Sequence, residues 1–160
     1  MKTKKIVLAA LLASLVCVAT MIIKVPSPLK GYVNLGDCIV LLAGWTLSPV
    51  YGFLAAGVGS ALADVFSGYI IYAPATFIIK GLMAVIACLL SRKAKKLPFL
   101  ILSGLIAEVL MVAGYYVFEG FMYGFIPSLM NIPANAVQGI MGLIFGIILI
   151  RIFEKSGITK

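Results

Sequence analysis

The chain has 160 residues, no histidine and only five acidic residues. Histidine is the commonest metal ligand and the commonest general base in proteins, so its absence weakens the case for both kinds of site. No phosphate-binding loop of the form Gly-x4-Gly-Lys-Ser/Thr occurs either, which excludes ATP hydrolysis by that route. We therefore expect no enzymatic activity, no metal and no cofactor.

Cysteine is also scarce. The three cysteines, Cys17, Cys38 and Cys88, are odd in number, far apart and set among apolar residues. Neither a disulfide framework nor a metal site follows from such a pattern. We expect all three to be packing residues.

Charge is the next scarce property. Charged residues make up 11% of the chain, against about 25% in soluble domains. Hydrophobic residues reach 63%, and the mean hydropathy is +1.18. The chain is therefore expected to be an integral membrane protein. At roughly 20 residues per span, its length allows one domain, residues 1–160, with about six helices.

Ten of the thirteen basic residues fall in three short clusters, which are Lys2, Lys4 and Lys5; Arg92, Lys93, Lys95 and Lys96; and Arg151, Lys155 and Lys160. Cytoplasmic loops of membrane proteins are enriched in Lys and Arg. Because each cluster adjoins an apolar run, membrane orientation explains the net charge of +8 better than nucleic-acid binding does. The clusters place both termini on the cytoplasmic side.

Hydropathy and helix breakers predict an all-α bundle of six transmembrane helices. Their expected ranges are 6–23, 35–47, 49–66, 74–90, 97–118 and 131–153, with loops over 25–31 and 119–130. The second of these helices is short for a full span. The first helix resembles a signal peptide, but its apolar run extends without a cleavage site, so we expect it to be retained. Glycine and alanine crowd the second and third helices, which predicts close packing there.

Apart from Lys24 and Lys30 in the first outer loop, five charges lie away from the basic clusters and fall in the outer half of this bundle: Asp37, Asp64, Lys80, Glu108 and Glu119. Intramembrane charges are costly and are functional or paired by default. Together they predict an outward-facing polar pocket. Lys80 either forms a structural pair with Asp64 or Glu108 or also faces a ligand. Asp37 either caps the second helix or belongs to the site, and Glu119 is either a site residue or a solvated loop residue.

The start of the last helix carries three amides on one face, Asn131, Asn135 and Gln138, at spacings of four and three. Amides supply both donors and acceptors, so ligand contact is favoured over contacts between helices. Tyr115 and Tyr116 are the candidates to stack on a flat ligand. The other aromatic residues at this end are assigned mainly to an interfacial belt: Tyr32, Phe66, Tyr69, Tyr72, Phe118, Phe121, Tyr123 and Phe125.

Three segments resemble a known family. The segments 31–37 (Gly-Tyr-Val-Asn-Leu-Gly-Asp), 59–68 (Gly-Ser-Ala-Leu-Ala-Asp-Val-Phe-Ser-Gly) and 72–81 (Tyr-Ala-Pro-Ala-Thr-Phe-Ile-Ile-Lys-Gly), together with six helices in about 160 residues, resemble the S components of energy-coupling factor (ECF) vitamin transporters. Ala9 and Ala13 match the family's Ala-x-x-x-Ala motif on helix one. The resemblance covers nearly the whole chain.

This resemblance implies a multi-pass subunit of a prokaryotic plasma membrane that captures a vitamin from outside. It implies partnership with a transmembrane T component, docked through Ala9 and Ala13, and with two ABC-type ATPases. In the family the first loop contributes to the substrate site, which adds Asn34 to the candidates. Apart from its ligand, these partners and membrane lipid, no further partner is expected.

The outer half carries about three net negative charges, which favours a neutral or weakly basic heterocycle. Similarity to the hydroxymethylpyrimidine and pyridoxine-type subgroup points the same way, while pantothenate-type members share much of the pattern. Two alternatives from other classes stay open. One is a stand-alone proton-coupled carrier in which Glu108 relays protons, and the other is a membrane enzyme acting on a lipid-linked substrate.

Overall fold

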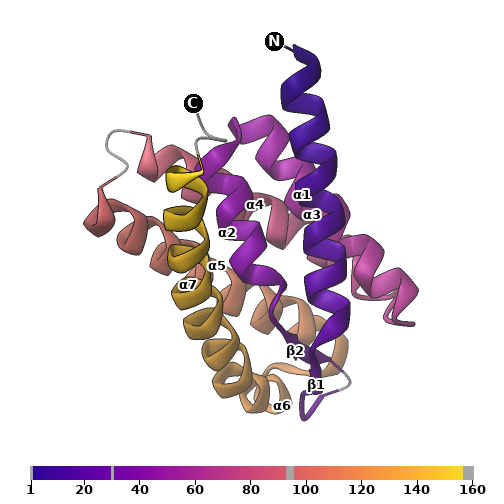
Figure 1. Ribbon diagram of the computed structural model, residues 1–160. Coiled ribbons are helices and arrows are strands. Elements are labelled where there is room, and N and C mark those ends of the chain that lie inside the picture. Colours follow the sequence, from indigo (N-terminus) through magenta and orange to yellow (C-terminus); the bar gives the residue numbers. More distant parts are fainter. Residues whose placement is uncertain (1, 30, 93–95, 157–160) are drawn as a thin grey trace.

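The computed structural model describes residues 2–29, 31–92 and 96–156 as a helical bundle with one small hairpin (Figure 1). The elements in chain order are α1 (Lys2–Ile22), β1 (Lys24–Pro26), β2 (Tyr32–Asn34), α2 (Gly36–Thr46), α3 (Pro49–Phe66), α4 (Ala73–Ser91), α5 (Leu97–Tyr123), α6 (Phe125–Ser128), the 3-10 turn η1 (Leu129–Asn131) and α7 (Ile132–Lys155).

Two predicted loops contain regular structure. The first loop forms an antiparallel hairpin in which Lys24 faces Asn34 and Pro26 faces Tyr32. The loop predicted over 119–130 is wrong, because α5 continues to Tyr123 and is followed by α6 and η1. Gly124, with φ of +95°, makes the break between α5 and α6, a conformation that favours glycine. Glu119 therefore lies on a helix and is not a loop residue.

Five helices in the described part of the chain are long and apolar enough to cross a membrane. α2 is not one of them, because its 11 residues span roughly 16 Å at 1.5 Å per residue, against a hydrocarbon core of ~30 Å. α2 exists as expected but is short. That six helices cross the membrane stays a prediction.

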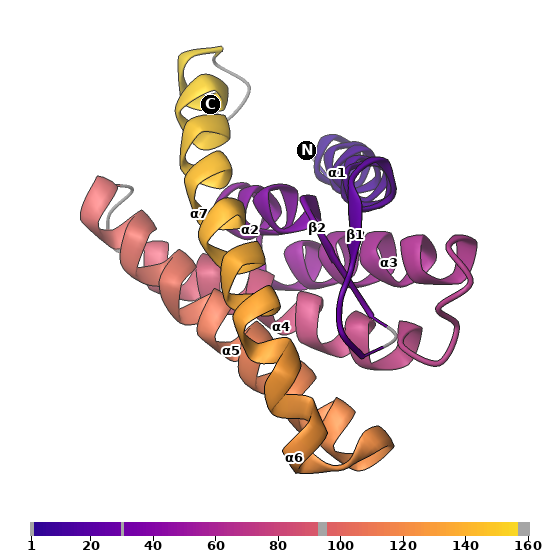
Figure 2. The same cartoon turned by 90° about the horizontal axis from the view of Figure 1, so that it is seen from below.

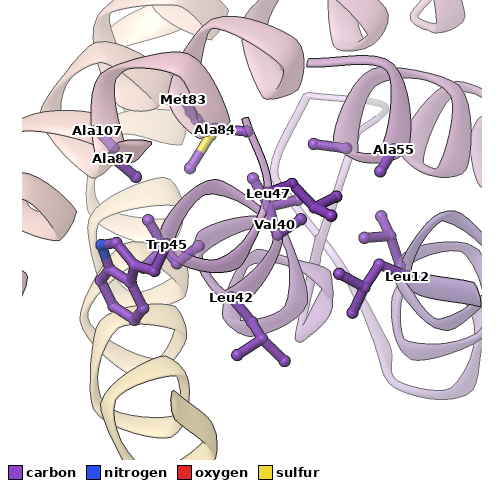
Figure 3. Packing of buried hydrophobic residues seen from close by; sticks show 14 of the residues in the cluster. Leu12, Val40, Leu42, Trp45, Leu47, Ala55, Met83, Ala84, Ala87 and Ala107 are labelled. Carbon is purple, nitrogen blue, oxygen red and sulfur yellow. The ribbon is translucent and has the colours of Figure 1, made fainter. Parts of the chain in front are cut away.

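α2 forms the centre of the hydrophobic core (Figure 3). Its residues Val40, Leu42 and Trp45 are almost fully buried. Leu12 of α1 packs on one side of α2 and Met83 of α4 on another, as the close-up shows. A helix enclosed on all faces reads as a continuous apolar run, which explains why the sequence pattern alone makes α2 look like a membrane span.

Small residues let the helices approach closely, as predicted. A Cβ added to Gly44 would stand 2.6 Å from the carbonyl oxygen of Ala84 on α4, and one added to Gly59 would stand 2.4 Å from that of Ala13 on α1. Both positions therefore require glycine. Ala9 and Ala13 are partly buried and pack against the core, so the face of α1 that bears them is turned toward the bundle.

The start of α1 and the end of α7 lie at one end of the bundle, and the hairpin and α6 lie at the other (Figure 1). Viewed from below, the hairpin lies across that opposite end (Figure 2). The described residues of the basic clusters lie near the first end, and the cluster members Lys93, Lys95 and Lys160 fall outside the described residues. An even number of spans requires the start of α1 and the end of α7 to lie at the same end of the bundle, as they do. That this end faces the cytoplasm stays a prediction.

Candidate functional site

A pocket opens under the hairpin, at the end of the bundle opposite the chain termini. Its lining comes from five helices, the hairpin and the adjoining loop segments, and most of it is polar or aromatic. The lining residues are Thr20, Ser27, Gly31, Tyr32, Asn34, Ser60, Asp64, Tyr69, Tyr72, Thr76, Lys80, Tyr115, Glu119, Asn135 and Gln138.

A buried polar network, which we call the floor, lies at the base of the pocket and consists of Asp37, Lys80 and Gln138. The Nζ of Lys80 donates to Oδ1 of Asp37 in a buried ion pair. The Nε2 of Gln138 donates to Oδ2 of Asp37 at 2.7 Å, and its Oε1 accepts from the backbone N–H of Asn34 at 2.8 Å. The floor thus joins α4, α2, α7 and the hairpin.

Lys80 does pair with an acid, but the partner is Asp37 and not Asp64 or Glu108. Asp37 is fully buried in the first turn of α2 and makes no side-chain cap of that helix. The ammonium of Lys80 also lies 5.5 Å from the centre of the Tyr115 ring, where a cation–π attraction adds to the ion pair.

Asp64 enters the pocket from the end of α3 and forms no salt bridge with the described residues, although Lys80 and Lys24 lie near enough to attract its charge. The hydroxyl of Tyr32 donates to its Oδ1 at 2.5 Å, which links the hairpin to α3. Burial, together with the neighbouring Asp64 carboxylate, raises the pKa of Tyr32. Tyr32 therefore keeps its proton, and with it this hydrogen bond, at physiological pH.

The tip of the hairpin is fastened to the far side of the pocket. Asn131 accepts from the backbone N–H of Leu29 at 3.2 Å and donates to Oε1 of Glu119 at 2.8 Å. Tyr72 donates to that same Glu119 oxygen at 3.3 Å. On the other side, Lys24 donates to Ser67 at 2.8 Å. The hairpin is thus bound directly by Asn131 of η1, by Tyr72 at the start of α4 and by Ser67 just after α3. Glu119 of α5 supports it through Asn131.

A second group of polar atoms in the pocket, which we call the wall, is not used by the protein. Ser60 Oγ and Glu119 Oε2 are buried and have no hydrogen-bond partner within the described residues, and the same holds for Ser27 Oγ. No hydrogen bond is formed by the side chain of Asn135 within that part of the chain either, although it lines the pocket. Because unpaired buried polar groups are costly, the wall is suited to a polar ligand.

The cavity volume of the pocket is about 30 Å³. A site of that volume holds about one water molecule. A vitamin-sized ligand therefore needs the hairpin or the surrounding side chains to move.

Seven of the predicted binding residues line the pocket: Asn34, Asp64, Lys80, Tyr115, Glu119, Asn135 and Gln138. Four do not. Asp37 lies behind Lys80, and Asn131 fastens the hairpin. Tyr116 and Glu108 instead line a separate apolar groove of about 390 Å³ between α5 and α7. Neither Tyr116 nor Glu108 is among the residues that line the pocket.

Sequence reasoning missed several lining residues. Tyr32, Tyr69 and Tyr72 were assigned to an interfacial belt but line the pocket. Ser60 and Thr76 were not considered. A signal for both was present, because each lies four residues before a lone charge, Asp64 and Lys80, and so shares its helix face.

Within the described residues, no group of three or more Cys, Asp or Glu side chains is placed to hold a metal ion. The polar pocket in an apolar helical bundle instead defines a multi-pass membrane protein with a site for a small polar ligand.

Known proteins share this architecture. A family model described as "ECF-type riboflavin transporter, S component" matches residues 1–155. The chain belongs to this family of S components. It is thus a substrate-binding subunit of the ECF vitamin transporters and a multi-pass protein of the prokaryotic plasma membrane. S components are transport subunits and not enzymes; in ECF transporters they associate with a T component and ATPases.

Two relatives and one solved structure are similar to this chain. An uncharacterized protein of Pyrococcus woesei is 35% identical over 132 residues, covering 82% of this chain and 88% of its own. The thiamine precursor transporter HmpT of Lactococcus lactis subsp. cremoris (strain MG1363) is 27% identical over 163 residues, covering 98% and 92%. A structure described as the S component of a bacterial ECF transporter superposes with a TM-score of 0.80 at 26% identity, covering 97% and 98%.

Proposed function

We propose that this chain captures a small, weakly basic heterocycle of the hydroxymethylpyrimidine type from outside the cell for an ATP-driven importer. The observation that carries the proposal is the wall: Ser60 Oγ and Glu119 Oε2 line the pocket, are buried and have no hydrogen-bond partner within the described residues, and the amide of Asn135 lines the pocket beside them. A heterocycle with amino and hydroxyl groups and ring nitrogens supplies matching donors and acceptors.

Charge supports the same class of ligand. Lys80 is neutralised by Asp37, whereas Asp64 and Glu119 form no salt bridge in the described part of the chain. The pocket therefore carries excess negative charge, which disfavours an anionic ligand such as pantothenate. It favours a neutral or weakly basic ring whose N–H groups donate to the carboxylates.

The similarity to the transporter HmpT favours a thiamine precursor, and the description of the family model favours riboflavin as the second candidate. A cavity of about 30 Å³ has to expand less for a single ring than for three fused rings with a sugar-like chain. A ligand of the vitamin B6 type, also a single ring, fits the same argument.

Mass spectrometry of the small molecule that copurifies with the detergent-solubilised chain tests the substrate. Calorimetric titration with hydroxymethylpyrimidine, pyridoxine, riboflavin and pantothenate should give the tightest binding for hydroxymethylpyrimidine. Tighter binding of riboflavin would overturn the substrate assignment while keeping the role of the subunit.

We further propose that six helices cross the membrane with both termini in the cytoplasm, so that the pocket opens outward. The basic residues at the starts and ends of the helices support this orientation, because they gather at the end of the bundle opposite the pocket. Labelling of single cysteines from outside the cell, at the exposed Ile70 and at Ser156, should modify the first position only. Labelling of Ser156 would reverse the topology.

The partners we propose are a T component and two ABC-type ATPases, with α1 as the docking helix. Ala9→Trp should abolish uptake and leave ligand binding by the purified chain intact. Ile22→Trp, an exposed position near the other end of α1, is the matched control and should leave both unchanged. Loss of ligand binding in Ala9→Trp would show that Ala9 serves the fold, since its helix face is turned toward the bundle.

Uptake by cells that lack the ATPases separates this proposal from a stand-alone carrier. An importer driven by ATP loses uptake in such cells. Uptake that survives there and collapses with an uncoupler would support proton coupling.

A further inference from the structure

Glu108 is a buried acid that the pocket does not use. It lies near the middle of α5, and only 4% of its surface is exposed. Neither of its carboxyl oxygens has a hydrogen-bond partner within the described residues. A carboxylate in this position would lack both water and hydrogen-bond donors, which is among the costliest arrangements inside a membrane.

Two glycines of α7 face this carboxyl group. A Cβ added to Gly139 would stand 3.2 Å from Oε2 of Glu108, and one added to Gly142 would stand 2.9 Å from Oε1. The same Cβ on Gly142 would stand 2.7 Å from Cβ of Asp37. Both distances are too short for a real Cβ, so Glu108 Oε1 and the Cβ of Asp37 lie within about 6 Å of each other against Gly142, and any side chain at that position would push them apart.

The titratable groups that act on Glu108 come from two neighbouring helices. α2 contributes Asp37 and Cys38, and α4 contributes Lys80. α7 places Gly139 and Gly142 against Glu108 and has no titratable residue before Arg151. With both acids ionised, this group would hold two negative charges against one positive charge. One further positive charge is needed for balance.

A metal ion does not supply that charge well. Both oxygens of Asp37 are already bound, one to Lys80 and one to Gln138. Only the two oxygens of Glu108 itself would remain as ligands, whereas hard cations take six or more oxygens. A proton on Glu108 needs no further ligand.

We propose that Glu108 holds a proton in the empty pocket and acts as the reserve hydrogen-bond donor to Asp37. A ligand that binds Lys80 or Gln138 draws that group away from an Asp37 oxygen. The carboxyl group of Glu108, which lies close to Asp37 beside Gly142, then turns and its O–H donates to the freed oxygen. The proton stays on Glu108, and no covalent bond changes. The link to ligand rests on the proposed function, whereas the proton on Glu108 does not.

Infrared spectroscopy tests the proton on the empty chain. At neutral pH we expect the carbonyl band of a protonated carboxylic acid that disappears in Glu108→Gln and persists in Glu154→Gln, a surface acid paired with Arg151. If Glu108→Gln does not fold, the double variant Asp64→Asn, Glu119→Gln removes the two pocket acids that form no salt bridge, and the same band should survive in it. A wild-type chain without a band assigned to Glu108 would overturn the proposal.

Calorimetric titration with hydroxymethylpyrimidine tests the donor role. Glu108→Gln keeps an N–H donor and should bind within about twofold of wild type, whereas Glu108→Leu should bind about tenfold or more weakly. Wild-type affinity should fall as pH rises, and that of Glu108→Gln should not. Equal affinity in all three proteins would overturn the donor role. A wild-type chain that does not bind this probe would count against the proposed substrate, and the infrared result would then decide the proposal.

Discussion

The floor and the wall of the pocket lie within one cavity, yet they treat polar atoms differently. In the floor, Asp37, Lys80 and Gln138 bind one another. In the wall, atoms of Ser60 and Asn135 have no partner within the described residues. A satisfied network contributes to the fold, and an unsatisfied group is suited to a ligand. Substitutions in the floor should therefore change stability first, and substitutions in the wall should change affinity first.

Asp37→Ala should produce the largest effect. It leaves the ammonium of Lys80 buried without a counter-charge, which costs about 3–5 kcal/mol of folding free energy. We expect a large fall in melting temperature of the detergent-solubilised chain, or loss of the folded protein. Glu154→Ala, which removes a half-exposed pair with Arg151, is the control and should cost about 0–1 kcal/mol. Equal melting temperatures in the two variants would contradict the structural role of the floor.

Asn135→Ala should come next, and it should act on affinity. Removal of an amide that binds only ligand weakens binding about tenfold or more, which corresponds to about 1.4 kcal/mol, with little change in melting temperature. Asn131→Ala, one turn earlier, should instead lower the melting temperature because Asn131 fastens the hairpin to Glu119. An unchanged dissociation constant in Asn135→Ala would remove this residue from the site.

Ser60→Ala should have a smaller effect on affinity, about threefold to tenfold, because one neutral hydrogen bond is lost. The empty protein should be no less stable, since the buried hydroxyl has no partner within the described residues. Ser14→Ala is the matched control on α1, where the hydroxyl bonds only to a backbone carbonyl of its own helix. A fall in melting temperature specific to Ser60→Ala would place Ser60 with the floor.

Tyr32→Phe should give the smallest change, about 1 kcal/mol of stability, from loss of the hydrogen bond to Asp64. The pKa of Tyr32 is raised in the folded protein, so its contribution is fully present below its unfolded value of about 10 and is lost as pH rises above it. Above that pH, the melting temperature should therefore fall less steeply with rising pH in Tyr32→Phe than in wild type. Parallel curves would contradict the raised pKa.

Much of the fold could be predicted from the sequence, because apolar runs and basic clusters report directly on helices in a membrane. The sequence did not show whether α2 faces protein on all sides or faces lipid. A helix that faces protein on all sides and one that faces lipid are both uniformly apolar, so composition does not distinguish them. The extent of α5 past Phe118 was also missed, because Gly120 and Gly124 resemble loop residues and only Gly124 ends the helix.

Prediction of the candidate site likewise found unusual residues but not how they are paired. The lone charges and the amides were found because such groups are rare in apolar helices. The partner of Lys80 was not, since Asp37 lies 43 positions away and the pairing depends on how α2 and α4 pack. Tyr32 and Tyr72 were misassigned because an amphipathic ring suits the lipid interface and a polar pocket equally well.

The hydrogen bonds that fasten the hairpin also affect the rates of ligand association and dissociation. We expect that a ligand enters and leaves only when contacts such as those of Lys24 with Ser67 and of Leu29 with Asn131 open. Such gating slows association and dissociation together, so affinity alone understates how long a captured molecule stays. A subunit built in this way suits scarce solutes, because it retains each molecule through a long wait.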